Sequence, residues 1–158
     1  MSESPNWWNI KASAYVTERY ELQKEYSDGD MFFVAGRTSS YSDVGKPIFF
    51  DQFDEMGEKG MMDIKTGVFT APKDGRYVLA FQGTSGEANT ALSIRLKDGK
   101  KLATNSYTMA ARQDISKGGS VSMKTTANLK KGDTVSVVLE EGQLQEDAVF
   151  IGFYKQKM

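Results

Sequence analysis

Short apolar runs alternate with turn residues from Met31 to the end of the chain, and helical periodicity is scarce there. The most informative run, RYVLAF (76–81), is apolar on both faces. One face carries Tyr77, Leu79 and Phe81, and the other carries Val78 and Ala80. A strand with one solvent-facing side would alternate with polar residues. We therefore expect both faces of this strand to be covered, and we expect the same of AVFIGFY (148–154).

The remaining runs predict an all-β sandwich or barrel. They are MFFVAG (31–36), PIFF (47–50), GVFTA (67–71), two strands within 91–107 joined at Asp98-Gly99, SVSMKTTANL (120–129) and TVSVVLEE (134–141). Asp-Gly between alternating runs favours a tight hairpin. The connections are expected to be polar loops at 37–46, 51–60 and 110–119, with turns at 72–75 and 130–133. Gly152 in the last run predicts a bend or a close backbone approach.

Residues 1–30 differ from the rest, so we divide the chain into an N-terminal arm (1–30) and one globular domain (31–158). Apolar residues from Trp8 to Tyr26 recur at helical spacing. This pattern favours a short helix or coiled-coil segment, and a loosely docked arm is the alternative. The segment MSESPNWWNIKASAY lacks the uninterrupted apolar core of a signal peptide.

Composition excludes most familiar catalytic chemistry. The 158 residues include no cysteine and no histidine, which removes thiolate nucleophiles, imidazole bases, disulfides and the usual zinc ligands. A formal net charge of -1 provides no overall field that would attract nucleic acid. No apolar stretch approaches the ~20 residues that span a bilayer. An enzyme, a nucleic-acid partner and a membrane span are therefore not expected.

Two charged groups are candidate ligand sites. Asp51, Asp54 and Glu55, with Glu58, carry the carboxylate oxygens that calcium prefers, although acidic turns are more often simply solvated. A possible patch for anionic ligands consists of Lys97, Lys100, Lys101, Lys130 and Lys131. Lysines in turns also discourage aggregation of sheet edges, which is the alternative interpretation.

The order of these runs resembles the C1q globular domain, a tumour necrosis factor-like jelly roll. The most specific stretch is TGVFTAP followed by DGRYVLAF (66–81), and LKKGDTVSVVL (129–139) and FIGFY (150–154) resemble the last strands of the family. No Gly-X-Y collagen repeat accompanies them. The resemblance implies a ten-stranded jelly roll that assembles as a homotrimer. The residues expected in the core or the trimer interface are Phe69, Tyr77, Phe81, Phe150 and Phe153.

The resemblance also implies the function. We expect a noncatalytic, secreted recognition module whose trimeric head binds glycans, microbial surfaces or protein receptors through loops 37–46, 51–60 and 110–119. The alternative is a structural module that trimerises within an extracellular matrix or another assembly. No cofactor is expected apart from the candidate calcium ion.

Overall fold

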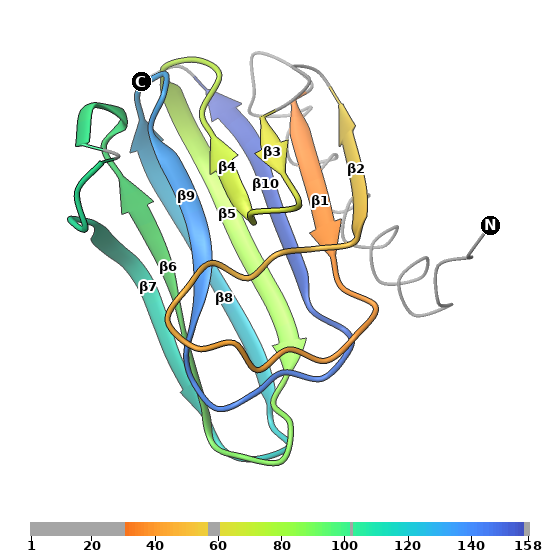
Figure 1. The fold of residues 1–158 in the computed structure, drawn as a ribbon. Coiled ribbons are helices and arrows are strands. Elements are labelled where there is room, and N and C mark those ends of the chain that lie inside the picture. Colours follow the sequence, from red (N-terminus) through yellow and green to blue (C-terminus); the bar gives the residue numbers. More distant parts are fainter. Residues whose placement is uncertain (1–30, 57–60, 102, 157–158) are drawn as a thin grey trace.

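The computed structural model describes residues 31–56, 61–101 and 103–156, which form ten strands and one short 3-10 helix (Figure 1). The elements are β1 (Phe32–Gly36), β2 (Gln52–Met56), β3 (Met62–Asp63), β4 (Val68–Thr70), β5 (Gly75–Thr84), β6 (Thr90–Lys97), η1 (Gly99–Lys101), β7 (Thr108–Ile115), β8 (Ser120–Leu129), β9 (Thr134–Glu141) and β10 (Val149–Gln156). The predicted arm, residues 1–30, lies outside the described residues.

The strands form two five-stranded antiparallel sheets that face each other. The first sheet has the order β2-β1-β10-β5-β8 and the second has the order β3-β4-β9-β6-β7. Neighbours that are distant in sequence, such as β1 and β10, give the crossing connections of a jelly roll. The all-β jelly-roll prediction is confirmed.

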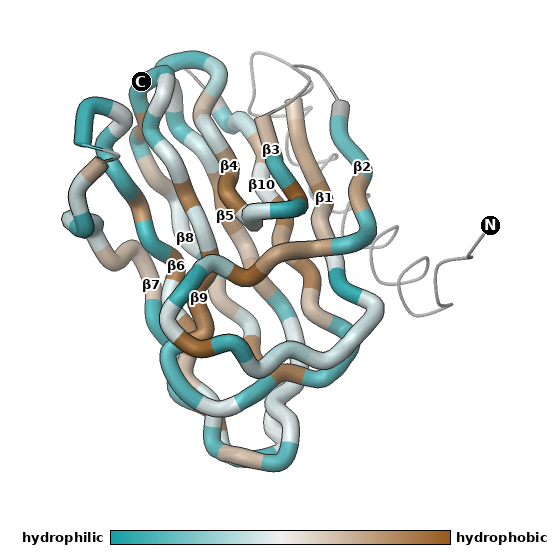
Figure 2. The backbone as a smooth tube through the Cα atoms, viewed as in Figure 1, coloured by the Kyte–Doolittle hydropathy of each residue, from teal (hydrophilic) through white to brown (hydrophobic). Residues whose placement is uncertain are grey.

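The core lies between the sheets because alternate side chains of each strand point inward. In the first sheet one inward row runs across β1, β10, β5 and β8. Its members are Ala35, Phe150, Phe81 and Met123, which are at most 5% exposed. Figure 2 shows hydrophobic positions along the strands and hydrophilic positions concentrated in the connections.

The turn predictions at 72–75 and 130–133 are confirmed, since β4 ends at Thr70 before β5, and β9 begins at Thr134. The segment 130–133 includes Gly132 with a φ of 96°, a left-handed conformation that glycine adopts without strain. The close approach expected at Gly152 is also present, because a Cβ there would overlap the ring of Phe33.

The strand predicted at 47–50 is wrong. Pro47 makes only an isolated bridge to Val138, and the amide of Ile48 donates to the Val137 carbonyl at 2.8 Å. Proline has no amide hydrogen, so this segment lies beside β9 without forming a regular ladder.

Two polar segments predicted as loops are strands instead, which corrects the interpretation of 51–60 and 110–119. Gln52–Met56 forms β2 and Thr108–Ile115 forms β7, each at the edge of its sheet. Edge strands bury less side-chain surface than central ones, so polar sequences are compatible with strand pairing there.

The hairpin predicted at Asp98-Gly99 exists, but its turn is wrong. Strands β6 and β7 pair with Leu96 opposite Thr108, and η1 occupies part of the long connection. The Asp98 carboxylate accepts a hydrogen bond from the Lys100 amide at 2.8 Å. This local bond starts a helical turn in place of a two-residue hairpin turn.

Candidate interaction surfaces

The first sheet carries a second apolar cluster on the face turned away from the sandwich core. It consists of Phe32, Val34, Val78, Val149, Ile151 and Phe153, each at most 8% exposed. We call these six residues the outer apolar face. All ten strands of the described residues belong to the two sheets, so those strands supply no third layer over this face.

The five aromatic residues expected in the core or interface lie in two different places. Phe69, Tyr77, Phe81 and Phe150 belong to the sandwich core and are at most 1% exposed. Phe153 belongs to the outer apolar face, where it lies between Phe32 and Val78 in the strand register. Of the five, only Phe153 therefore lies outside the sandwich core.

Tyr77 combines core packing with a polar contact. Its ring makes edge contacts with Phe69 and Tyr154, and its hydroxyl donates to the Lys73 carbonyl at 2.7 Å. Burial raises the pKa of Tyr77 to about 12, although this hydrogen bond opposes the rise. The Tyr77 hydroxyl can donate this hydrogen bond only while it is protonated.

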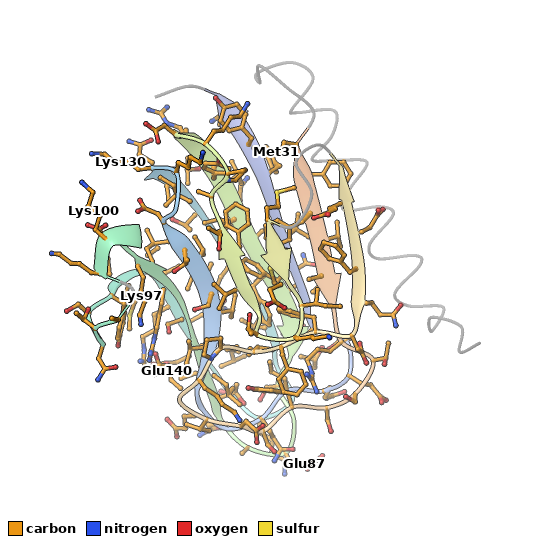
Figure 3. All side chains as sticks on the ribbon, turned by 45° about the horizontal axis from the view of Figure 1, so that its top comes forward. Met31, Glu87, Lys97, Lys100, Lys130 and Glu140 are labelled. Carbon is orange, nitrogen blue, oxygen red and sulfur yellow. The ribbon has the colours of Figure 1, made fainter. Side chains whose placement is uncertain are left out.

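The predicted lysine patch is drawn from segments that the fold brings to one end of the sandwich (Figure 3). Lys100, Lys130 and Lys131 line a hollow of about 370 Å³, and Lys97 and Lys130 line a neighbouring hollow of about 410 Å³. Lys101 follows Lys100 in η1. The fold thus gathers residues that are separated by about thirty positions in the sequence.

Aspartates hold these turns in place. The Asp133 carboxylate accepts hydrogen bonds from the amides of Gly99 at 2.9 Å and Lys130 at 3.0 Å. The Asp74 carboxylate accepts from the Lys131 amide at 2.7 Å. The lysine backbones are therefore fixed, and the aspartates partly offset the positive charge around the hollows.

Arg37 organises the connection between β1 and β2. Its side chain is buried, and its guanidinium lies 4.7 Å from the ring centroids of both Tyr41 and Phe49. It also donates to the Phe49 carbonyl at 2.7 Å. Burial lowers the pKa of Arg37, and the nearby charge of Asp51 opposes that shift. The predicted recognition loop 37–46 is held by this stacked arginine.

The connections at the other end of the sandwich bond to one another (Figure 1). The Tyr41 amide donates to the Leu144 carbonyl at 3.0 Å, and the Gly86 amide donates to the Gln143 carbonyl at 2.9 Å. The Gly118 amide donates to the Gly86 carbonyl at 3.1 Å. Four connections thus form one continuous loop surface.

The candidate calcium ligands are not brought together. Asp51 accepts hydrogen bonds from the Thr38 amide at 3.0 Å and the Thr38 hydroxyl at 2.6 Å. Asp54 and Glu55 are consecutive in β2, so their side chains point to opposite faces. Glu58 lies outside the described residues. Within the described ranges no three acidic side chains are arranged to hold a metal ion.

An ion pair on the second sheet was missed at the sequence level. Arg95 Nη2 donates to both Glu140 carboxylate oxygens at 2.7 and 2.8 Å, and the Ser93 hydroxyl donates to Glu140 at 2.6 Å. Burial alone would raise the pKa of Glu140, but the hydrogen bonds and the charge of Arg95 outweigh it and lower the pKa. Strand pairing between β6 and β9 was the information needed to find this pair.

The two antiparallel sheets and their order define a tumour necrosis factor-like jelly roll. The C1q domain family model matches residues 32–154, and the chain therefore belongs to the C1q domain family. Proteins of this family generally act as trimeric recognition or assembly modules without catalysis, and they are typically extracellular.

Solved structures support the same fold. The globular domain of the zebrafish complement 1qA protein is 24% identical, with a TM-score of 0.64, over 81% of this chain and 99% of that chain. Murine APRIL, in a crystal structure at pH 5.0, is 11% identical with a TM-score of 0.56, over 77% of this chain and 97% of that chain. A search of the curated proteins finds no match. In the part of the chain that the structure describes, no helix has the length and apolar character needed to cross a membrane.

Proposed function

We propose that this chain is a secreted, noncatalytic recognition module that assembles as a homotrimer and binds extracellular glycans, microbial surfaces or protein receptors. The observation that carries the proposal is the match of the C1q domain family model to residues 32–154, because domains of this family self-assemble into trimers and bind ligands.

The mass of the particle tests the assembly. Light scattering coupled to size exclusion at micromolar concentration should report three times the 17.5 kDa chain mass. A single-copy particle would overturn the homotrimer.

Trimerisation would present each weak site three times. Linked sites have effective concentrations in the millimolar range, so modest contacts give strong avidity. We assign the first candidate site to the lysines around the hollows at one end of the sandwich. Four lysines line the two hollows (Lys97, Lys100, Lys130 and Lys131) against three aspartates (Asp74, Asp98 and Asp133), and this excess of positive charge favours an anionic glycan.

A sulfated polysaccharide column tests this site. The variant K100E/K130E/K131E should elute at clearly lower salt than the wild type, because charge contacts are screened by salt. Unchanged elution would remove the lysines from the proposal.

A charge-matched control separates a local site from net charge. The variant K46E/K65E/K117E changes the same number of lysines at exposed positions outside the hollows. It should elute close to the wild type. Equal losses in the two triple variants would show that only overall charge matters. An intact trimer that binds nothing on a glycan and protein array would favour the structural role instead.

A further inference from the structure

The two hollows at the lysine-rich end of the sandwich adjoin each other. Asp98, Lys130 and Asp133 line both of them, so Lys130 stands at their junction (Figure 3). Volumes of about 370 and 410 Å³ fall within the size range of small-ligand pockets, roughly 300–1,000 Å³. One elongated ligand can therefore occupy both hollows at once.

The first hollow, which is lined by Lys100, Lys130 and Lys131, presents its positive charges to a ligand. The aspartates that line it are Asp74, Asp98 and Asp133. Each aspartate accepts a hydrogen bond from the backbone amide of one of these lysines, at distances between 2.7 and 3.0 Å. Within residues 31–56, 61–101 and 103–156, no ion pair joins these aspartates to the lysine ammonium groups. The ammonium groups are therefore placed to contact sulfate or carboxylate groups of a ligand.

The second hollow is different because its lining comes from both sheets. Leu96 and Thr108 belong to the second sheet, and Asn128 and Leu129 belong to the first. Leu129 is part of the sandwich core, and Leu96 packs against that core. The hollow thus has an apolar floor where the core reaches the end of the sandwich.

One polar group of the second hollow is oriented by its neighbour. Arg76 Nε donates to the Asn128 side-chain oxygen at 3.2 Å, which leaves the Asn128 Nδ2 group as a donor toward a ligand. The Lys97 ammonium donates to the Thr104 carbonyl at 3.0 Å, so part of its bonding capacity is already used. The second hollow therefore suits a less charged group than the first.

These features match an N-acetylated amino sugar. The methyl of its acetamido group suits the apolar floor, and the acetamido carbonyl can accept a hydrogen bond from Asn128 Nδ2. We propose that the two hollows together bind an acidic oligosaccharide, with an N-acetylated sugar in the second hollow and the sulfate or carboxylate groups of the adjoining sugar on the lysines of the first. This inference rests on the anionic-glycan site proposed above and names the sugar units that it takes.

Two tetrasaccharides test the proposal by titration calorimetry. The first probe alternates uronic acid with a sulfated N-acetylhexosamine, and the second carries N-sulfate in place of each N-acetyl group. The N-acetylated probe should bind tighter by roughly fivefold, since it gains the methyl contact and the hydrogen bond to Asn128. Charge alone predicts the reverse order, because the N-sulfated probe is more negative.

Thr108→Trp tests the second hollow without changing any charge. Thr108 is exposed and lines only this hollow, so an indole ring there should fill the space at little cost to the fold. The variant should lose the preference for the N-acetylated probe and leave the affinity for the N-sulfated probe nearly unchanged. The control is Ser42→Trp, at an exposed position that lines neither hollow, and it should keep the wild-type preference.

Lys100→Gln tests the first hollow, because Lys100 lines that hollow alone. It removes one charge contact that both probes share, so it should weaken both by a similar factor. A loss confined to the N-acetylated probe would contradict the assignment of the two hollows.

The failures are distinguishable, and binding counted per chain does not depend on the trimer. Tighter binding of the N-sulfated probe, or a preference that persists in Thr108→Trp, would overturn the N-acetyl assignment and leave the lysine site standing. A single-stranded oligonucleotide that binds as tightly as the N-acetylated probe would show a site for any polyanion and would also overturn it. A wild-type chain that binds neither probe and is not retained on the sulfated polysaccharide column would refute the lysine site itself.

Discussion

Gly152 on β10 and Phe33 on β1 lie directly opposite each other, and the Phe33 ring fills the space that a side chain at position 152 would need. The ring has no room to move, since it stacks on Phe69 at 5.0 Å and meets Phe150 edge-on at 5.2 Å. A glycine is therefore required for this aromatic core to close.

Gly152→Ala should destabilise the domain by roughly 1–3 kcal/mol, the usual cost of overpacking a core. Urea unfolding would measure it. Gly83→Ala is the control, because a Cβ there meets nothing nearer than 3.4 Å. Equal losses in the two variants would contradict the role of the Phe33 ring.

Arg95→Met should lower the free energy of unfolding at neutral pH by about 2 kcal/mol, since it removes hydrogen bonds to a largely buried carboxylate. The pKa of Glu140 is lowered in the folded protein, so its contribution is present above its ordinary pKa and is lost as the pH falls through the folded value. The difference in free energy of unfolding between the wild type and Arg95→Met should therefore become smaller in acid, below a pH of about 4.

Denaturant unfolding at several pH values checks this dependence. Glu140→Gln is the companion variant, because it keeps the shape of the side chain and removes the charge that titrates. A gap between wild type and Arg95→Met that stays constant from neutral to acid pH would assign the loss to packing instead.

The two-faced strand shows what the sequence could predict about the fold. The alternation of Tyr77 and Leu79 with Val78 placed them on opposite faces, and the structure confirms it with two separate clusters. Buried central strands leave such a pattern because both faces exclude water. Edge strands carry fewer apolar positions, so the sequence predicts loops for the polar segments that form β2 and β7.

The residues that meet in the candidate sites are set by the order and pairing of the strands, which the spacing of apolar residues along the sequence does not reveal. Lys100 and Lys131 lie in separate turns, and only the positions of β6, β8 and β9 in the two sheets bring them to the same hollow. The same holds for Arg95 and Glu140, which only the pairing of β6 with β9 brings together. Local sequence identified the residue types, whereas their partners required the fold.

Tyr77→Phe should make the domain less sensitive to alkali. The folded pKa of about 12 exceeds the ordinary value of 10, so the neutral hydroxyl stabilises the fold below pH 10, and that stability is lost as the pH rises toward 12. Two pKa units correspond to about 2.7 kcal/mol at most. At neutral pH the free energy of unfolding of the variant should be about 1 kcal/mol lower than that of the wild type, because the hydrogen bond to the Lys73 carbonyl is lost. As the pH rises, the free energy of unfolding of the variant should then fall less steeply than that of the wild type.

Unfolding midpoints between pH 9 and about 12 would show this difference in slope. Tyr107→Phe is the control, because Tyr107 is 42% exposed. It should follow the wild-type curve. Identical slopes for Tyr77→Phe and the wild type would mean that the Tyr77 hydroxyl does not titrate with unfolding.

Phe153→Asp should give a dissociated or insoluble product, because it places an unpaired charge on the outer apolar face. Val44→Asp is the control, since Val44 is 54% exposed and should tolerate the charge. Sedimentation of the two proteins at equal concentration would measure the difference. A soluble trimer in Phe153→Asp would exclude this face from the interface.

Loss of the Phe153→Asp trimer could also follow from damage to the subunit, and Thr126→Arg separates the two causes. Thr126 lies in the same cross-strand row as Phe153 but is exposed, so a single subunit should accept arginine with little loss of stability. In a ring that packs neighbouring copies over this row, the added bulk and charge would be trapped between subunits. We therefore expect Thr126→Arg to keep the wild-type unfolding midpoint, measured on the dissociated chain, while its trimer dissociates at higher protein concentration. A Thr126→Arg trimer as tight as the wild type would place the β8 edge outside the interface.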